Sequence, residues 1–261
     1  MSAWLMARVP PALAGIGFLV LWEVLVRLLA APVYILPGPL LIAETLWTDG
    51  GSLFRALGIT FGVTVTALIA ATAGGALLAV LMAQSRMIER SLFPYAVAAQ
   101  VTPVVAIAPL IIIWVDNAFA AQVACAWIVA FFPIVSNTMV GLKSADRNLS
   151  DLFSLYGARR WQVHRLLRFP AALPYFLAGL RISGGLALIG AVVAEYVAGT
   201  GGGDVGLATR IMEAGHRLET ARVFAGLVLL SVTGILIYLA LDLVSRRLLR
   251  HWHESAETGP D

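Results

Sequence analysis

The chain has 261 residues, of which 60% are hydrophobic and only 13% are charged, and its formal net charge is +3. A soluble domain carries about 25% charged residues, so this composition excludes an ordinary soluble enzyme or binding module. Several apolar stretches reach about 20 residues, the length of an α-helix that crosses a bilayer core. They are too long and too uniformly apolar for the alternating strands of a membrane β-barrel. We therefore predict an all-α polytopic membrane protein.

In chain order, six membrane-spanning helices are expected. They lie at residues 11–31, 57–83, 92–115, 118–142, 171–198 and 221–244. The first is not a cleavable signal peptide, because Glu23 and Arg27 interrupt it and no small-residue cleavage site precedes Pro32. Residues 11–250 thus form a single six-span domain, preceded by a short N-terminus (1–10) and followed by a disordered polar tail (251–261).

The distribution of lysine and arginine predicts the orientation, because cytoplasmic loops carry an excess of both. One side of the membrane receives four: Arg55, Arg210, Arg217 and Arg222. The other receives twelve, namely Arg8, Arg86, Arg90, Lys143, Arg147, Arg159, Arg160, Arg165, Arg168, Arg246, Arg247 and Arg250. Both termini and the loop at 143–170 should therefore be cytoplasmic.

Prolines and glycines indicate how the spans are joined and packed. The segment 36–39, Leu-Pro-Gly-Pro, predicts a turn before a short outer helix, and a second outer helix is expected at 207–218. Pro103 and Pro109 should interrupt the third span, and Pro133 the fourth. Small residues recur in the second and fifth spans, which favours close helix packing, with a moving or pore-lining face as the alternative.

Three motifs resemble the signatures of nucleotide, protease or zinc sites, but their context argues against each. Residues 201–206 match G-x-G-x-x-G, yet a membrane helix precedes them instead of the strand that a dinucleotide site requires. Gly-x-Gly-Asp at 201–204 resembles the intramembrane aspartyl proteases, which need two aspartates in one site. Asp204 has no second aspartate at its membrane depth, since Asp242 lies at the cytoplasmic end of the sixth span. His251 and His253 lack the further ligands of a zinc site. We expect no catalytic or metal site, and no P-loop is present.

Ionisable residues within spans are costly in lipid and therefore informative. Glu23 and Arg27 are spaced i,i+4 and predict a local ion pair. Arg181 should extend toward the interface or bond carbonyl groups. Glu195 either pairs with an arginine of the outer loop or lines the translocation path. The other candidates for that path are uncharged polar residues in the third to fifth spans: Gln100, Thr102, Asn137, Thr138 and Ser183.

The segment Asn148–Pro170 is a basic, amphipathic interruption between two spans. An apolar face recurs at i, i+3, i+4 and i+7, formed by Leu149, Leu152, Phe153 and Tyr156. Asn148 or Ser150 can cap this first short helix, and Gly157 suits a left-handed stop. A second, basic helix is expected from Arg159 to Arg168, ending before Pro170. Two short helices joined at a glycine form a docking element for a soluble partner.

This segment resembles the cytoplasmic loop of ABC-importer permeases, whose pattern is Glu-Ala-Ala, three residues, Gly, nine residues, Ile-x-Leu-Pro. The aligned residues are Asp151-Leu152-Phe153, Gly157 and Leu167-Arg168-Phe169-Pro170. Asp replaces Glu and Leu-Phe replaces Ala-Ala, which makes the docking face bulkier. The rest of the chain is similar to the nitrate/sulfonate/taurine branch, at segments 36–39, 90–94, 102–110, 132–138, 171–174, 179–181 and 193–195.

The resemblance implies a type I ABC-importer permease fold and a homodimer in the bacterial inner membrane, with a cytoplasmic ATPase dimer and an outer solute-binding protein as partners. ATP and Mg²⁺ would belong to the ATPase, and this chain would need no cofactor. The ATPase-docking residues implied are Asp151, Leu152, Phe153, Tyr156, Gly157, Ala158, Arg159 and Pro170. The expected substrate is a small sulfonate, nitrate or taurine-like anion, with a pyrimidine-type or other nitrogen heterocycle as the alternative. An ATP-independent channel or secondary transporter is a more remote alternative.

Overall fold

A computed structural model describes residues 3–199 and 205–249 of the chain. Every regular element within these residues is a helix, as the sequence predicts. The glycine run at 200–204 and the tail at 250–261 lie outside the described residues, so the expectations for the glycine motif and the disordered tail stay predictions.

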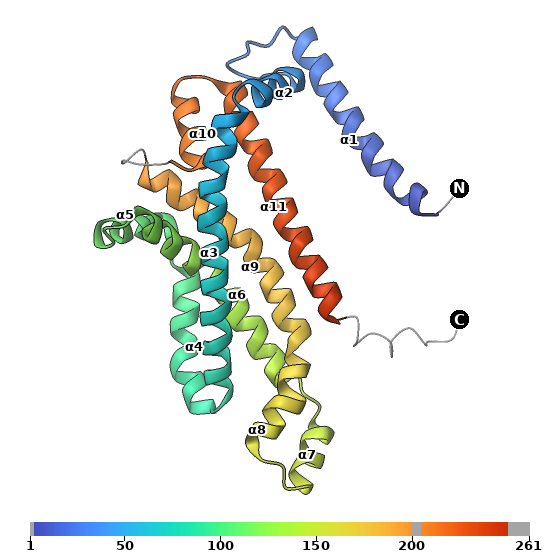
Figure 1. The fold of residues 1–261 in the computed structure, drawn as a ribbon, viewed down its shortest axis with the longest axis vertical. Helices are drawn as coiled ribbons and strands as arrows, with labels where there is room; N and C mark the ends of the chain where they lie inside the picture. Colours follow the sequence, from blue (N-terminus) through green and yellow to red (C-terminus); the bar gives the residue numbers. More distant parts are fainter. Residues whose placement is uncertain (1–2, 200–204, 250–261) are drawn as a thin grey trace. The chain divides into compact units, whose positions relative to one another are not determined.

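The helices form two compact units (Figure 1). Unit 1 comprises Met1–Ile59 and Gly202–Ser231, and unit 2 comprises Thr60–Gly201 and Val232–Asp261. The boundary falls inside two long helices, α3 (Gly50–Ala83) and α11 (Thr220–Leu249). Each unit therefore contains one part of both helices.

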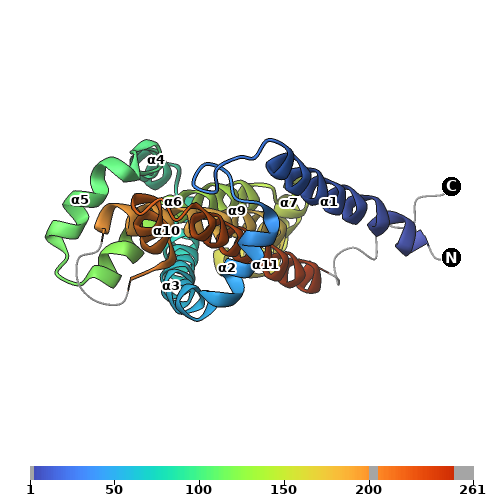
Figure 2. The same ribbon diagram turned by 90° about the horizontal axis from the view of Figure 1, so that it is seen from above.

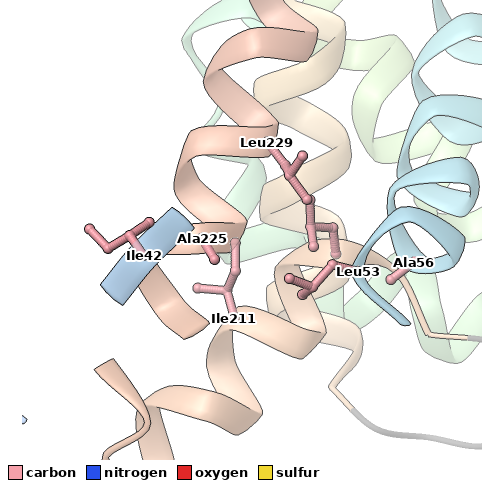
Figure 3. Packing of buried hydrophobic residues seen from close by; sticks show 7 residues of the cluster. Ile42, Leu53, Ala56, Ile211, Ala225 and Leu229 are labelled. Atoms are coloured by element: carbon pink, nitrogen blue, oxygen red, sulfur yellow. The ribbon is translucent and has the colours of Figure 1, made fainter. Parts of the chain in front are cut away.

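Unit 1 contains α1 (Ala3–Leu28), α2 (Pro39–Thr48), α10 (Leu207–His216) and the first parts of α3 and α11. The short helices α2 and α10 lie where the sequence predicts two short helices, whose place on the outer side of the membrane stays a prediction. Their apolar faces meet α3 and α11 in one buried cluster (Figure 3), formed by Ile42, Leu53, Ala56, Leu207, Ile211, Ala225 and Leu229. Burial of this cluster fixes the short helices, which at ten residues would be marginal alone.

Glu23 of α1 fixes the start of α2. Its Oε1 accepts a 2.7 Å hydrogen bond from Nε of Arg27, which confirms the predicted ion pair. Its Oε2 accepts the backbone N–H of Leu40 at 3.2 Å, in the first turn of α2. Gly38, before that turn, leaves room for this carboxylate, since a Cβ there would lie 2.5 Å from Oε2. The Glu23 carboxylate thus satisfies one of the backbone N–H groups that the start of a helix leaves unpaired.

Unit 2 is centred on α6 (Ala118–Lys143) and α9 (Phe169–Ala198), which pack against each other along their length. Three glycines bring the two backbones into contact. An added Cβ would lie 2.8 Å from Cα of Ala172 at Gly141, 2.7 Å from the Pro133 carbonyl oxygen at Gly179, and 2.7 Å from Cα of Ala126 at Gly190. The small residues of the fifth span therefore serve close helix packing.

Within residues 3–199 and 205–249, four helices are long and apolar enough to cross a membrane: α3, α6, α11 and the continuous helix Arg160–Ala198. A fifth span results if α4 (Arg86–Val101) and α5 (Val104–Trp114) count as one, but these two are bent by 99°. Figures 1 and 2 both show α5 turned away from α4. The first predicted span is helical as α1, although α1 is not among the helices that meet the length and hydropathy criteria.

The predicted proline interruptions are only partly correct. The third span breaks at Thr102-Pro103, where both residues are extended, with ψ of 122° and 110°. A proline disfavours helical backbone in the residue before it, which explains the break. Pro109 and Pro133 instead lie inside α5 and α6, so the predicted interruptions at these two positions are wrong.

Candidate functional site

The basic segment between α6 and α9 folds into two short helices at one end of unit 2 (Figure 1). The first, α7, runs from Arg147 to Leu155. Its N-cap is Asp146, whose carboxylate accepts the N–H of Asn148 at 2.7 Å and of Leu149 at 3.4 Å. The predicted caps, Asn148 and Ser150, are therefore wrong by two to four residues. Aspartate is as good an N-cap as asparagine or serine, so residue type alone did not separate them.

Gly157 ends α7 as predicted, in the left-handed region with φ of +66°. The N–H of Gly157 donates to the Ser154 carbonyl at 3.0 Å, and the N–H of Ala158 donates to the Phe153 carbonyl at 2.9 Å. This pair of bonds is the Schellman motif, which satisfies the last carbonyls of a helix. A Cβ at Gly157 would meet nothing within 4 Å, so the requirement for glycine here comes from the backbone conformation.

The second helix begins at α8 (Arg160–Val163), where the backbone N–H of Arg159 donates to Oε1 of Gln162 at 2.7 Å. It does not end before Pro170. A π-helical turn, His164–Arg168, carries it directly into α9, so one helix runs from Arg160 to Ala198. Pro170 lies in the first turn of α9 after the π-turn, where its missing N–H is tolerated. The predicted helix end is thus corrected, and the loop is joined rigidly to a membrane span.

The turn between α7 and α8 carries an open groove of about 480 Å³ with apolar walls. We call its lining the coupling surface: Leu152, Phe153, Tyr156, Gly157, Ala158, Arg159, Gln162 and Leu166. Tyr156 is 83% exposed and Leu166 61% exposed, so two large apolar side chains are exposed together at this groove. Six of the eight predicted docking residues lie here, whereas Asp151 and Pro170 do not line the groove.

Gln162 and Leu166 are the members of the coupling surface that the sequence analysis missed. Both belong to the second helix, for which only its charge was considered. Gln162 was an available signal, because a glutamine three residues after an N-cap can accept the N-cap backbone N–H, as it does here from Arg159. Next to them, burial lowers the pKa of His164 below its ordinary value, and the nearby Arg168 cation lowers that pKa further.

The predicted translocation-path residues do not share one environment. Ser183 is fully buried and donates its hydroxyl hydrogen to the Ala130 carbonyl at 2.6 Å, which ties α9 to α6. Asn137 donates from Nδ2 to the Pro133 carbonyl at 2.8 Å within α6. Thr138 is buried beside it in α6. These contacts are those of helix-packing residues.

The remaining path candidates lie elsewhere on unit 2. Gln100 is exposed near the end of α4, and the Thr102 hydroxyl donates to the Ala98 carbonyl at 2.7 Å at the break before α5. Glu195 is fully buried in the last turns of α9 and takes part in polar interactions, so it is not an isolated charge. That these six residues line a translocation path stays a prediction.

Arg181 is held by a carboxylate, a partner that the sequence analysis did not identify. Its NH1 group donates to Oδ1 of Asp242 at 2.8 Å, which joins α9 to α11. The other oxygen, Oδ2, accepts from Nε of Arg246 at 2.7 Å. One carboxylate therefore bridges two guanidinium groups. A small residue permits this approach, because a Cβ at Gly184 would collide with Cδ1 of Leu241.

Within the described ranges, no group of three His, Cys, Asp or Glu side chains is placed to hold a metal ion. The features that remain are a docking element at one end, a tightly packed helix pair behind it and several membrane-length helices. This combination suits a membrane component that responds to a partner.

Comparison with known proteins identifies that class. Residues 71–250 match the family described as "Binding-protein-dependent transport system inner membrane component". The chain belongs to this family. It is thus a permease subunit of an ABC importer, a multi-pass protein of the inner membrane, as the resemblance of the loop at 148–170 implied.

Relatives with different named substrates match the chain over nearly its whole length. The formylaminopyrimidine transport permease protein ThiX of Halalkalibacterium halodurans is 35% identical, covering 92% of this chain and 94% of the relative. The riboflavin transport system permease protein RibX of Chloroflexus aurantiacus is 36% identical, covering 91% and 87%. The taurine transport system permease protein TauC of Escherichia coli is 30% identical, covering 89% and 85%.

Two solved ABC transporters share the fold. One is an amino acid ABC transporter crystallised with histidines, with a TM-score of 0.63 and 17% identity, covering 80% of this chain and 97% of that one. The other is the MetNI methionine transporter in an inward-facing conformation, with a TM-score of 0.64 and 19% identity, covering 78% and 97%. At these identities the likeness establishes the fold alone, which confirms the predicted type I permease fold.

Proposed function

We propose that this chain forms, as a homodimer, the solute pathway of an ATP-driven importer and docks its ATPase through the coupling surface. The observation that carries the proposal is the exposed apolar groove at the α7–α8 turn. Large apolar side chains exposed together mark a binding site, and the ones here belong to a loop with the spacing of a coupling loop. ATP and Mg²⁺ would be bound by the partner, and this chain itself would need no cofactor.

The connections of the loop support a mechanical role. Its first helix follows α6, and its second continues through the π-turn into α9. Because α6 and α9 touch backbone to backbone at three glycines, they respond to a load as one body. Closure of an ATPase dimer would displace the loop and rock this pair, which is a rigid-body alternation between inward- and outward-facing states.

Paired substitutions in the loop test the docking. Tyr156→Ser with Leu166→Ser removes two apolar walls of the coupling surface, whereas Leu155→Ser removes an equally exposed side chain (85%) outside it. We expect the ATPase to co-purify with the Leu155→Ser protein and not with the double variant. Equal retention of the ATPase by both would refute docking at this groove.

The same importer role requires that the loop and both termini face the cytoplasm, as the lysine and arginine distribution indicates. The chain has one cysteine, and Cys125 is fully buried. A cysteine introduced at the exposed Trp161 would therefore be the sole reactive thiol. We expect an impermeant thiol reagent to label it in inside-out vesicles and not in intact spheroplasts, and the reverse pattern would invert the orientation.

For the substrate, we propose a nitrogen heterocycle of the pyrimidine or flavin kind. Two relatives named for such substrates are 35% and 36% identical to this chain, whereas those named for sulfonates, taurine and nitrate are 24–30% identical. An anion pathway would also benefit from a cation near mid-membrane. The one candidate, Arg181, is already held in an ion pair by Asp242.

A sulfonate, nitrate or taurine-like anion is the second candidate, supported by the relatives with those names. A thermal-shift screen of the cognate solute-binding protein separates the two, with a formylaminopyrimidine, riboflavin, taurine, an alkanesulfonate and nitrate as probes. Stabilisation by a heterocycle alone supports the first candidate. Stabilisation by an anion alone supports the second and leaves the importer role intact.

A further inference from the structure

A second cavity, of about 710 Å³, lies where α3 ends, α4 begins and α6 passes into α7. Its charged lining consists of Arg86, Arg90, Lys143, Arg147, Arg168 and Glu89. Five cations and one carboxylate give this lining a formal charge of +4. We call it the basic cavity. It is separate from the coupling surface, with which it shares no lining residue.

The carboxylates nearby do not neutralise this charge. Glu89 is bonded to Nζ of Lys143, which accounts for one of the five cations. Asp146 is turned toward the start of α7, where it accepts backbone N–H groups. Within the described residues, the other four cations, all arginines, form no ion pair with a carboxylate. Arginine presents a planar fork of donors that matches phosphate oxygens.

Two helix starts face the same cavity. Arg86 is the first residue of α4, which has 16 residues, and Arg147 is the first residue of α7, which has nine. The N-terminus of a helix carries partial positive charge and disfavours a cation beside it. Two arginines at two helix N-termini therefore raise the positive potential of the cavity instead of relieving it. An anion between them would be favoured by the arginine side chains and by the start of α4, whereas the start of α7 is already capped by the Asp146 carboxylate.

The surroundings of the cavity indicate where such an anion comes from. Apolar residues are exposed at its edge, with Met87 of α4 at 78% and Leu81 of α3 at 45%. Both helices belong to segments predicted to span the membrane. Because basic residues are enriched on the cytoplasmic side of a span, the basic cavity is expected at the cytoplasmic leaflet. Basic pockets between helices on this side bind the head groups of anionic lipids. The volume is also within the range of small-ligand pockets.

We propose that the basic cavity binds the phosphate head group of an anionic phospholipid, with the acyl chains along the exposed apolar residues of α3 and α4. The ligand is a phosphate ester, and it comes from the bilayer. Because the cavity touches both the α3–α4 turn and the start of α7, a bound lipid would also brace the loop that carries the coupling surface. This site is independent of the ATPase docking proposed above.

Native mass spectrometry of the full-length permease in detergent tests the proposal, with phosphatidylglycerol and phosphatidylcholine as probes. The test variant is Arg86→Gln/Arg147→Gln. Arg165→Gln/Arg247→Gln is the matched control, since it removes the same charge from exposed positions outside the cavity. At roughly a fivefold effect for each basic residue near an anionic lipid, the test variant should bind phosphatidylglycerol about 30-fold more weakly than the control.

A charge-conserving variant, Arg86→Lys/Arg147→Lys, should keep most of the binding, which excludes a general loss of structure. Selective retention of phosphatidylglycerol by the wild type, the control and this variant supports the proposal. Equal binding of both lipids, or equal loss in the test and control variants, overturns it. Full displacement of the lipid by millimolar inorganic phosphate would assign the site to a soluble anion, and occupation only by an added ATPase would assign it to the partner; either result overturns the lipid source.

Discussion

The contact between α6 and α9 can be tested with two glycines of the same helix. Gly179 faces α6, where a methyl group would lie 2.7 Å from the Pro133 carbonyl oxygen and 2.9 Å from Cβ of Asn137. Gly185, six residues further along α9, is exposed, and a methyl group there would meet nothing within 4 Å. Gly179→Ala and Gly185→Ala are therefore the same chemical change in the same helix, and they differ only in what the methyl group contacts.

The expected difference follows from two terms. Each substitution gains helix propensity of up to about 1 kcal/mol, and this gain cancels when the two variants are compared. Forcing a methyl group into a packed site costs about 1–3 kcal/mol, and the neighbours at Gly179 include a backbone oxygen that cannot move aside. For a chain of this size, 1 kcal/mol corresponds to a shift of about 2–4 °C in Tm. Gly179→Ala should thus melt roughly 2–12 °C below Gly185→Ala.

The chain provides its own reporter for this measurement. Cys125 is the only cysteine and is fully buried in α6, so a thiol-reactive dye becomes fluorescent only as the helices separate. Melting curves of the two variants in one detergent give the difference directly, with the wild type as reference. If the two variants melt within about one degree of each other, α6 and α9 are not in backbone contact at Gly179 and the one-body behaviour of the pair is refuted.

Three further predictions concern the loop and the charge bridge. Gly157→Val should lose ATPase co-purification, because a left-handed conformation costs a residue with Cβ about 1–2 kcal/mol. Gly157→Asn should retain most of the co-purification. Equal loss in both variants would show that the left-handed conformation is not what docking requires of Gly157. Asp242→Asn should destabilise the protein by ~1–3 kcal/mol in the dye assay, which is less than the loss of a fully buried ion pair costs, because the Arg181 side chain is 33% exposed. Arg246→Gln should have little effect, because the Arg246 side chain is 78% exposed. An equal effect of both variants would contradict the bridge. Because the folded pKa of His164 lies below its unfolded value, the unfolded state binds the proton more readily, and stability should fall as pH drops through about 6.5. His164→Gln should reduce this loss of stability in melts between pH 7.5 and 5.5. An unchanged pH profile in this variant would contradict the role of His164.

The sequence predicted the helical class and four of the six expected spans that the described residues contain as membrane-length helices, because apolar length is a local property that the bilayer imposes. The two outer helices and the stop at Gly157 were predicted for a similar reason, since turn residues act locally. Local sequence did not show which prolines break a helix and which lie within one. Pro103, Pro109 and Pro133 all read as breaks, yet a helix continues through the last two. Neighbouring helices can satisfy the freed carbonyls, and that depends on tertiary contacts.

The candidate site shows the same division between local and tertiary information. The α7 face and its glycine stop follow from spacing within nine residues. The partner of Arg181 is Asp242, 61 positions away, and its proximity depends on how α9 meets α11. The hydroxyl of Ser183 was a path candidate because only its polarity was visible in sequence. Its bond to the Ala130 carbonyl is a property of the packed pair.

The packing of α6 against α9 also limits where a solute pathway can run. Ser183 is fully buried in this interface, and Gly179 and Gly190 close it to within backbone contact on either side. Opening a path between the two helices would break these contacts. The loop joined to both helices could then no longer move them together. The pair is better suited to move as one wall of the pathway, with solute passing along a face that does not touch the partner helix. In a homodimer that face would meet its symmetry mate, so a displacement applied at the coupling surface would widen or narrow the gap between the two walls without disturbing the packing inside either.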